Sequence, residues 1–203
     1  MNQIIKNTLA LFAITAVAGF LLGAVYEGTK EARAEQAIKT QQKAYKTVFE
    51  EASDFEDVSL EKAKDAIKYS KKEVVLEGAV KAFDSSSTLL GYVITVTAKE
   101  GYGGDIKFSV GVDIQGHVTG ISYLSITETA GLGMKAKDQK FIDQYTKTDT
   151  KDAFIVNKDG SDGAVIDAIG GATITSRAVT KGVNAACQAT QAFVNGGVSI
   201  EGE

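Results

Sequence analysis

The sequence predicts an α+β protein, in which a single amino-terminal transmembrane helix precedes a domain with a mainly antiparallel sheet and flanking helices. Three observations support this fold class. Residues 7–26 contain no charged side chain, residues 106–114 alternate between apolar and other side chains, and residues 176–195 place apolar side chains at helical spacing. A half-buried strand repeats every two residues and an amphipathic helix about every 3.6, so the last two patterns indicate different elements.

The uncharged stretch at residues 7–26 is long enough to cross a membrane. As a helix it spans roughly 30 Å, about one hydrocarbon core. A cleaved signal peptide is the alternative, but its apolar region is usually about 7 to 15 residues long, and Ala32-Arg33-Ala34 matches a cleavage site only loosely. We therefore expect an uncleaved anchor.

The orientation of this anchor is only weakly specified, because basic and acidic residues are mixed on its carboxyl side. A short amino end followed by a large domain fits an amino terminus in the cytoplasm. We expect a single-pass protein of the cytoplasmic (inner) membrane, with most of the domain outside the cytoplasm.

The residues after the anchor favour helices. Glu27 to Ser53 is rich in alanine, glutamate, lysine and glutamine, which are good helix formers. Leu60 to Tyr69 has the pattern of a second short helix, with Ser59 as its cap. We therefore divide the chain into an anchor at residues 1–26, a helical connector at 27–70 and a domain at 71–203.

Four strands are predicted in the middle of the chain. They cover Glu73 to Phe83, Leu89 to Ala98, Ile106 to Ile114 and Val118 to Ser125. The third alternates most regularly, which is typical of a half-buried strand. Together they predict an antiparallel sheet with helices at one side.

The last third of the chain mixes short elements with one long helix. We expect a short helix over Asp138 to Tyr145, and short strands over Ala153 to Val156 and Ala164 to Ile166. The final helix, over Ser176 to Asn195, should bury one apolar stripe. That stripe contains Val179, Val183, Ala186 and Phe193.

Composition excludes several classes of function. The net charge is −4, and no lysine- and arginine-rich patch with interleaved aromatics indicates nucleic-acid binding. The chain has one cysteine, Cys187, and one histidine, His117, too few for an internal disulfide or a usual zinc site. Nothing around His117 resembles a nucleophile elbow, so we predict neither a metal site nor a catalytic side chain.

The most informative stretch is DAIGGATIT, from Asp167 to Thr175. Paired glycines lead into hydroxyls at the start of a predicted helix, where free N–H groups and a partial positive charge attract phosphate. Thr173 or Thr175 would then lie beside a phosphate, as a hydrogen-bond donor or as a covalent attachment point. The same pattern is also typical of an ordinary threonine-capped helix after a glycine turn.

Two further stretches are rich in glycine. ITETAGLGMK, from Ile126 to Lys135, follows a strand and predicts a loop that passes close to a ligand or to another backbone segment. GYGGDI, from Gly101 to Ile106, contains Tyr102, which fits either a sheet-packing aromatic or one that stacks on a ligand.

These three motifs, in this order after a single span, resemble the FMN-binding domain found in the G subunit of the Rnf electron-transport complex. They are more distantly similar to the C subunit of the sodium-pumping NADH:quinone reductase. The resemblance covers the anchor and the chain from about Gly91 to the last helix. It implies FMN held covalently by a phosphoester at the final hydroxyl of the motif Asp-x-x-Ser/Thr-Gly-Ala-Thr-x-Thr/Ser, which is Thr175 here.

The resemblance also implies a set of cofactor-binding residues. They are Thr175, Thr173, Ala172, Gly171, Gly170, Glu128, Thr129, Gly131, Leu132 and Lys135. Glu128 fits either a ligand contact or a loop cap, and Lys135 either a solvated charge or a group that neutralises phosphate. Three residues depart from the family pattern: Gly170 replaces Ser or Thr, Ile126 replaces His, and Ala130 replaces Pro.

The function implied is that of an electron-carrying flavoprotein subunit of a membrane-bound, ion-translocating ferredoxin:NAD+ oxidoreductase, not catalytic alone. Its partners would be the A, B, C, D and E subunits of the Rnf complex, a flavin transferase that uses FAD, and the lipid bilayer. Alternatives are the FMN subunit of the quinone reductase, a free-standing anchored flavoprotein, and a flavin-free anchored docking module. With one span and no intramembrane charge, we do not expect the chain to form an ion path alone.

Overall fold

The computed structural model describes residues 2–148, 153–157 and 163–196 of the 203-residue chain. The chain divides into two compact units, one ending at Gln41 and the other beginning at Gln42.

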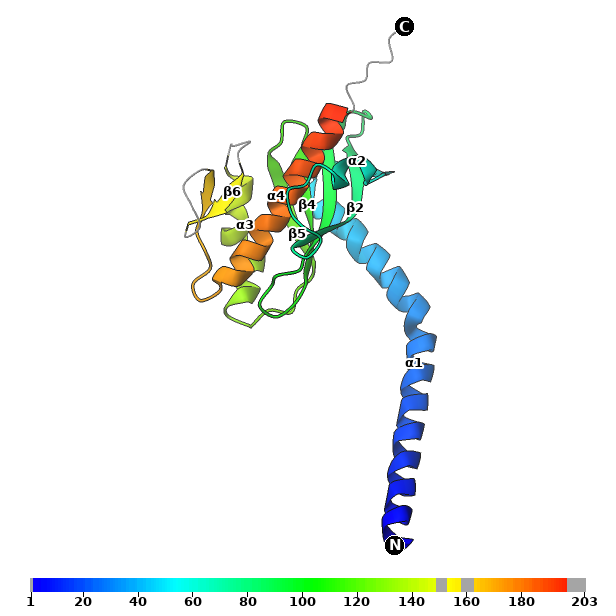
Figure 1. Ribbon diagram of the computed structural model, residues 1–203. Coiled ribbons are helices and arrows are strands. Elements are labelled where there is room, and N and C mark those ends of the chain that lie inside the picture. The colour runs from blue at the N-terminus through cyan, green and yellow to red at the C-terminus, as the bar shows by residue number, and fades with distance from the viewer. Residues whose placement is uncertain (1, 149–152, 158–162, 197–203) are drawn as a thin grey trace. The chain divides into compact units, whose positions relative to one another are not determined.

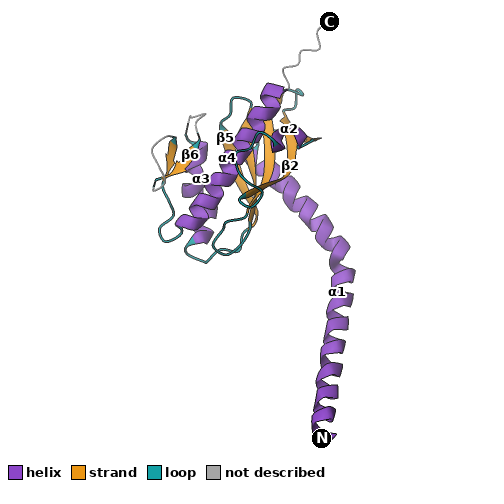
Figure 2. Cartoon of the chain, viewed as in Figure 1, coloured by secondary structure: helices purple, strands orange, loops and turns teal. Residues whose placement is uncertain are grey.

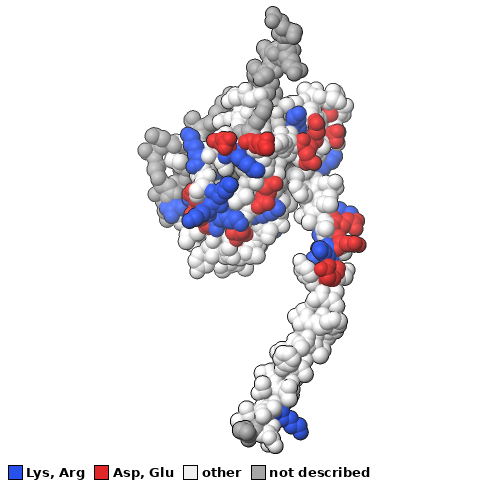
Figure 3. Space-filling model, turned by 45° about the vertical axis from the view of Figure 1, so that its right-hand side comes forward, with Lys and Arg blue, Asp and Glu red and all other residues white. Residues whose placement is uncertain are grey.

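The first unit is the greater part of helix α1, which runs without interruption over Asn2–Val48. Its most apolar window of 18 residues has a mean hydropathy of 2.2, and by length and composition α1 is able to cross a membrane. The uncharged stretch appears as a white section of the helix in Figure 3. The predicted apolar helix is therefore present, and the helix predicted after it is continuous with it as far as Val48.

The second unit is built on a five-stranded antiparallel sheet in the order β1-β2-β3-β4-β5 (Figure 2). The strands are β1 Asp54–Val58, β2 Val74–Phe83, β3 Leu89–Ala98, β4 Ile106–Asp113 and β5 Val118–Ser125. All four predicted strands are confirmed. The fifth, β1, lies in the segment that the sequence describes as a helical connector, and it pairs with β2 from Asp54↔Phe83 to Val58↔Ala79.

Short elements and one long helix complete this unit. They are α2 Glu61–Lys64, the 3₁₀ helix η1 Gly133–Lys137, α3 Gln139–Thr146, the parallel pair β6 Phe154–Val156 and β7 Ala164–Ile166, and α4 Thr173–Gly196. The predicted α3, β6 and β7 are confirmed, and α4 begins three residues before its predicted start.

Helix α2 is shorter than the predicted Leu60 to Tyr69. Ser59 Oγ accepts a long hydrogen bond from the N–H of Glu61, at 3.4 Å. The N–H groups further on are used elsewhere, because Lys68 N donates to Gln188 Oε1 and Ser70 N donates to the Glu73 carboxylate. These residues therefore do not continue the helix, which ends at Lys64 after one turn.

Helix α4 covers one face of the sheet, which we call the inner face (Figure 1). Its apolar stripe packs on β3 and β4, and Tyr145 of α3 is fully buried beside it. The predicted stripe on α4 is confirmed, because Val179, Val183, Ala186 and Phe193 are all buried.

The opposite face, the outer face, is covered by the last turn of α1 and the residues after it. Val48, Phe49 and Ala52 form a second apolar cluster with side chains of β2 and β3. The prediction that helices lie at one side of the sheet is therefore wrong. The third predicted strand, which is β4, is not half-buried as expected, because even Ser109 on its outer side is fully buried.

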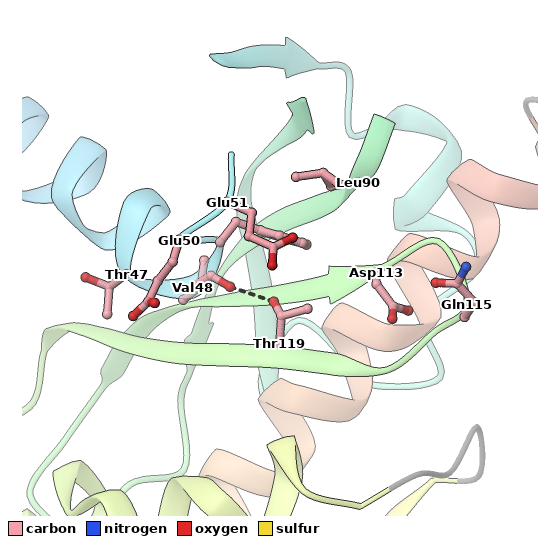
Figure 4. A pocket seen from close by; sticks show the side chains of 9 residues that line it. Thr47, Val48, Glu50, Glu51, Leu90, Asp113, Gln115 and Thr119 are labelled. Atoms are coloured by element: carbon pink, nitrogen blue, oxygen red, sulfur yellow. Dashed lines mark hydrogen bonds between the residues drawn. The ribbon is translucent and has the colours of Figure 1, made fainter. Parts of the chain in front are cut away.

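Glycines explain how the chain comes so close to the outer face. Gly111 of β4 pairs with Gly120 of β5. A Cβ on Gly111 would lie 2.8 Å from the Val48 carbonyl oxygen, and a Cβ on Gly120 would lie 2.9 Å from Val48 Cα. Thr119 Oγ1 donates a hydrogen bond to that same oxygen at 2.6 Å (Figure 4). Side chains larger than glycine at these two positions would exclude Val48.

Candidate functional site

A cavity of about 470 Å³ lies at the start of α4, within the size range of small-molecule sites. Three segments line it: the loop at Tyr102, residues 128–133, and the turn and first residues of α4 at 171–175. These segments belong to the three glycine-containing motifs of the sequence. The fold therefore brings all three motifs to one place.

The cavity collects most of the residues that the sequence predicts for cofactor binding. Those that line it are Thr175, Thr173, Ala172, Gly171, Glu128, Thr129 and Leu132. Gly170 and Lys135 instead line an adjoining cavity of about 470 Å³, together with Asp167. Gly131 lines neither cavity; with φ +76° it sets the path of its loop.

The turn that leads into α4 is held by one serine. Ser176 Oγ accepts a hydrogen bond from Ile169 N and donates one to the Ala172 carbonyl oxygen, both at 3.0 Å. Ala172 N also donates to the Ile169 oxygen at 2.9 Å, and Gly171 has φ +75°. A positive φ strains any residue with a Cβ, so glycine fits the second position of this turn.

Asp167, the acidic residue of the motif, supports the turn from outside the cavity. Its N–H donates to Gln144 Oε1 at 2.7 Å, and its carbonyl oxygen accepts from Gln144 Nε2 at 3.3 Å. Its carboxylate accepts from Asn157 Nδ2 at 3.0 Å. These contacts make Asp167 a positioning residue for the residues that follow it.

Thr175 is the most unusual residue of the cavity. Its side chain is fully buried, and its Oγ1 has no hydrogen-bond partner among the described residues. Thr180, on the same helix, satisfies its hydroxyl by donating to the Ser176 carbonyl oxygen at 2.8 Å. A buried hydroxyl without a partner costs about 1–3 kcal/mol, so a ligand that bonds to it offsets that cost. Tyr123 and Thr190 also have unpartnered hydroxyls within the described part of the chain, but neither lines the cavity.

The start of α4 also favours the binding of a negatively charged group. The first N–H groups of any helix have no intrahelical acceptor, and the helix dipole places a partial positive charge there. Thr175 is the third residue of α4. A phosphate group near its hydroxyl would therefore lie at a favourable end of the helix.

Glu128 and Gly133 shape the space next to Thr175. Glu128 is only 8% exposed, and its Oε1 accepts a hydrogen bond from Gly103 N at 3.2 Å. A Cβ on Gly133 would lie 2.6 Å from Glu128 Oε2 and 2.8 Å from Thr175 Oγ1. A Cβ at this position would displace the Glu128 carboxylate or the Thr175 hydroxyl, so glycine fits here.

The rim of the cavity is apolar and exposed. Tyr102 is 72% exposed, Ile174 is 50% exposed and Leu132 is 41% exposed. The sequence leaves Tyr102 open between sheet packing and flavin stacking, and its exposure at the cavity excludes sheet packing. Ile174 also lines the cavity and is not among the residues predicted from the sequence, although its place between Thr173 and Thr175 in the motif is a usable signal.

An ion-pair cluster lies behind the Tyr102 loop. Lys181 Nζ of α4 contacts Glu73 Oε1 at 2.7 Å and Glu100 Oε2 at 2.6 Å. The hydrogen bond from Lys181, with those from Ser70, lowers the pKa of Glu73 from 4.5 to about 2. Hydrogen bonds to Glu100 and Glu73 raise the pKa of Lys181. The cluster ties α4 to the beginning of β2 and to the residue that precedes the GYGG loop.

Another cavity, of about 480 Å³, opens beside Val48 on the outer face. Glu50, Glu51 and Asp113 line it, as Figure 4 shows. Carboxylates repel phosphate, so this cavity does not compete with the one at α4 as a nucleotide site.

Comparison with known proteins finds a family and relatives that resemble this chain. The family described as the FMN-binding domain matches residues 101–188, a range that includes every residue lining that cavity. The chain is 35% identical to the G subunit of the Na(+)-translocating ferredoxin:NAD(+) oxidoreductase complex of Acetobacterium woodii, over 93% of this chain and 92% of the relative. It is 32% identical to the G subunit of the proton-translocating ferredoxin:NAD(+) oxidoreductase complex of Clostridium ljungdahlii, over 94% of this chain and 97% of the relative.

A solved structure has the same fold. The crystal structure of Shewanella oneidensis NqrC matches with a TM-score of 0.55 over 80% of this chain and 98% of that chain. The two sequences are 18% identical, so this likeness concerns the fold alone.

Proposed function

This chain belongs to the family of G subunits of ion-translocating ferredoxin:NAD(+) oxidoreductase complexes, and we propose that it holds FMN through a phosphoester to Thr175 Oγ1. The observation that carries the proposal is the buried hydroxyl of Thr175, which has no hydrogen-bond partner among the described residues and belongs to a residue that lines a cavity at a helix start. FMN, when bound, supplies reversible electron transfer. The protein positions the cofactor, binds its phosphate at the positively polarised start of α4 and shields it from water.

Each segment of the cavity has a role in this proposal. The first N–H groups of α4 stabilise the charge that remains on the phosphate, by about 0.3–1 kcal/mol, or more if the group is partly buried. Glu128 and Thr129 offer polar groups to the cofactor, while Leu132 and Ile174 offer apolar walls to its ring. Lys135 and Gly170 lie behind the turn, in the adjoining cavity, where Lys135 contributes positive charge at longer range.

As an electron carrier, the chain would pass electrons between neighbouring redox subunits, in a complex whose other subunits are Rnf A, B, C, D and E. The relatives are named as subunits of ferredoxin:NAD(+) oxidoreductase complexes, which favours this assignment over a quinone reductase. We propose that α1 crosses the cytoplasmic membrane once and that the domain lies outside the cytoplasm. A tether there would prevent loss of the cofactor. A flavin transferase would form the bond by moving the FMN part of FAD to Thr175 Oγ1: the pyrophosphate bond breaks, AMP leaves, and the hydroxyl proton is released.

The test is the mass and colour of the full chain, produced together with the flavin transferase. We expect the wild-type chain to gain the mass of FMN less one water and to fluoresce in a denaturing gel. Thr175→Ser, which keeps a hydroxyl, should still gain flavin, and Thr175→Ala should not. Thr173→Ala is the matched control, because Thr173 lines the same cavity but its hydroxyl is not the proposed acceptor. Covalent flavin on Thr175→Ala would overturn the proposal.

A further inference from the structure

We propose that Tyr102 stacks on the flavin ring, and that Lys181, which does not line the cavity, holds Tyr102 in place through Glu100. This inference rests on the proposed function and assigns two residues to it. Tyr102 would contact the cofactor, whereas Lys181 would be a positioning residue.

Tyr102 has the properties of a side chain that binds a flat partner. It lines the cavity although its side chain is 72% exposed. Among the described residues that line this cavity, it is the one aromatic side chain. Leu132 and Ile174 line the same cavity from two other segments. A cavity lined by one aromatic ring and by aliphatic side chains suits a planar aromatic ligand, because stacked rings attract each other beyond the area they bury.

The loop that carries Tyr102 is fixed despite this exposure. Gly103 N donates to Glu128 Oε1 at 3.2 Å, and Thr127 Oγ1 donates to the Gly103 carbonyl oxygen at 3.1 Å. A Cβ on Gly103 would lie 2.3 Å from the Thr127 carbonyl oxygen, so the loop backbone rests directly on residues 127–128. Lys99 and Asp105 close the base of the loop with an ion pair at 2.6 Å. A rigid loop loses little entropy when its aromatic side chain stacks.

Lys181 connects this loop to the helix that begins at the attachment site. It lies six residues after Thr175 on α4 and contacts Glu100, two residues before Tyr102, at 2.6 Å. Its second contact, with Glu73 at 2.7 Å, anchors its side chain to the start of β2. The position of Tyr102 is therefore set relative to α4 itself.

Flavin fluorescence tests the stacking directly, because a stacked phenol quenches an excited flavin by electron transfer and a phenyl ring does not. The chain contains no tryptophan that could act as a competing quencher. We would compare Tyr102→Phe and Tyr102→Leu with the wild-type chain, each normalised to covalent flavin measured after denaturation. Both variants should fluoresce several-fold more strongly in the native state. Only Tyr102→Leu should also shift the flavin absorption bands and the midpoint potential, because phenylalanine still stacks.

The brace formed by Lys181 and Glu100 is tested with Lys181→Met and Lys181→Arg. Lys181→Met should raise native fluorescence less than Tyr102→Leu does, with equal covalent flavin, and Lys181→Arg should restore the wild-type value. Lys107→Met is the matched control, because Lys107 pairs with Glu77 elsewhere on the sheet. Glu100→Gln replaces the charged acceptor with a neutral one, so it weakens the same contact from the other side. It should raise native fluorescence in the same direction as Lys181→Met, by less, and it tests the brace even if Lys181→Met folds poorly.

The outcomes separate this inference from the proposed function. Equal native fluorescence in Tyr102→Leu and wild type would overturn the stacking. An unchanged flavin spectrum combined with lost electron transfer in the assembled complex would also overturn it, and would make Tyr102 a contact for another protein of the complex. Wild-type fluorescence in both Lys181→Met and Glu100→Gln would overturn the brace. Absence of covalent flavin from the wild-type chain would instead overturn the proposed function.

Discussion

Two places in the domain depend on glycines that leave no room for a Cβ, and they differ in what lies against them. On the outer face of the sheet, a Cβ on Gly111 would lie 2.8 Å from the Val48 carbonyl oxygen. At the cavity, a Cβ on Gly133 would lie 2.6 Å from Glu128 Oε2 and 2.8 Å from Thr175 Oγ1. The first place is occupied by the chain's own backbone, and the second borders open space.

Hydrogen bonding shows what this difference means. The Val48 oxygen accepts a hydrogen bond from Thr119 Oγ1 at 2.6 Å, so the contact on the outer face is complete. The Thr175 hydroxyl is buried and has no partner within the described ranges. A complete contact contributes to stability, whereas an incomplete one costs free energy until a ligand satisfies it. We therefore expect substitutions at the two places to separate folding from cofactor attachment.

The largest effect on stability should come from Gly111→Ala. Its Cβ would meet Thr119 Oγ1 at 2.3 Å and Val48 O at 2.8 Å, and overpacking of this kind costs about 1–3 kcal/mol. Urea denaturation should report this loss, while the covalent flavin per folded molecule stays at the wild-type level. Gly78→Ala, on β2, is the control, because no atom lies within 4 Å of the position that its Cβ would take. Equal losses in the two variants would mean that the close approach of Val48 does not determine the cost.

The next largest effect, expected from Gly133→Ala, is on the rate of covalent flavin attachment. Filling the space between Glu128 and Thr175 should slow covalent flavin attachment, measured per folded molecule, about tenfold, a change equivalent to about 1.4 kcal/mol. The rate is measured from in-gel fluorescence against time of incubation with the transferase and FAD. Gly170→Ala is the matched control, since Gly170 belongs to the same region but its Cβ would meet open space. Attachment at the wild-type rate in Gly133→Ala would show that the cofactor does not need this space.

The smallest effect is expected from the ion pair between Glu73 and Lys181, which lies outside both places. It should appear as a pH dependence of the unfolding free energy. The pKa of Glu73 falls from 4.5 to about 2 in the folded chain, chiefly through the hydrogen bond from Lys181. A lowered folded-state pKa adds stability that is present above pH 4.5 and is lost as the pH falls towards 2. The wild-type unfolding free energy should therefore drop more steeply as the pH falls from 4.5 towards 2 than that of Lys181→Met. Parallel curves would mean that the ion pair does not contribute to stability.

Much of the fold follows from local patterns in the sequence. The strands β2, β3, β4 and β5 are predictable because the alternation of their side chains is local information. The strand β1 is not, because its sequence DFEDV carries three carboxylates and has a polar pattern. Burial of the outer face is not predictable either, since it depends on contact between Val48 and Thr119, 71 residues apart in sequence.

The site is predictable to the extent that short motifs determine it. Thr173, Thr175 and Glu128 lie around one cavity as their motifs suggest. Lys135 and Gly170 lie on the other side of the turn, because η1 and the residues before α4 present them to the adjoining cavity. Which cavity a residue lines depends on three-dimensional packing, and a sequence motif alone does not contain that information.

Helix α4 has a consequence for which molecules the domain accepts. It is continuous from Thr173 to Gly196 and contains both Thr175 and Lys181, which lie about 9 Å apart along its axis. A cofactor joined to Thr175 must reach the Tyr102 loop, and the position of that loop depends on Lys181. We therefore expect a flavin analogue with a shortened sugar-alcohol chain to be esterified normally, yet to leave its ring short of Tyr102. The domain would thus discriminate among flavins by reach as well as by chemistry.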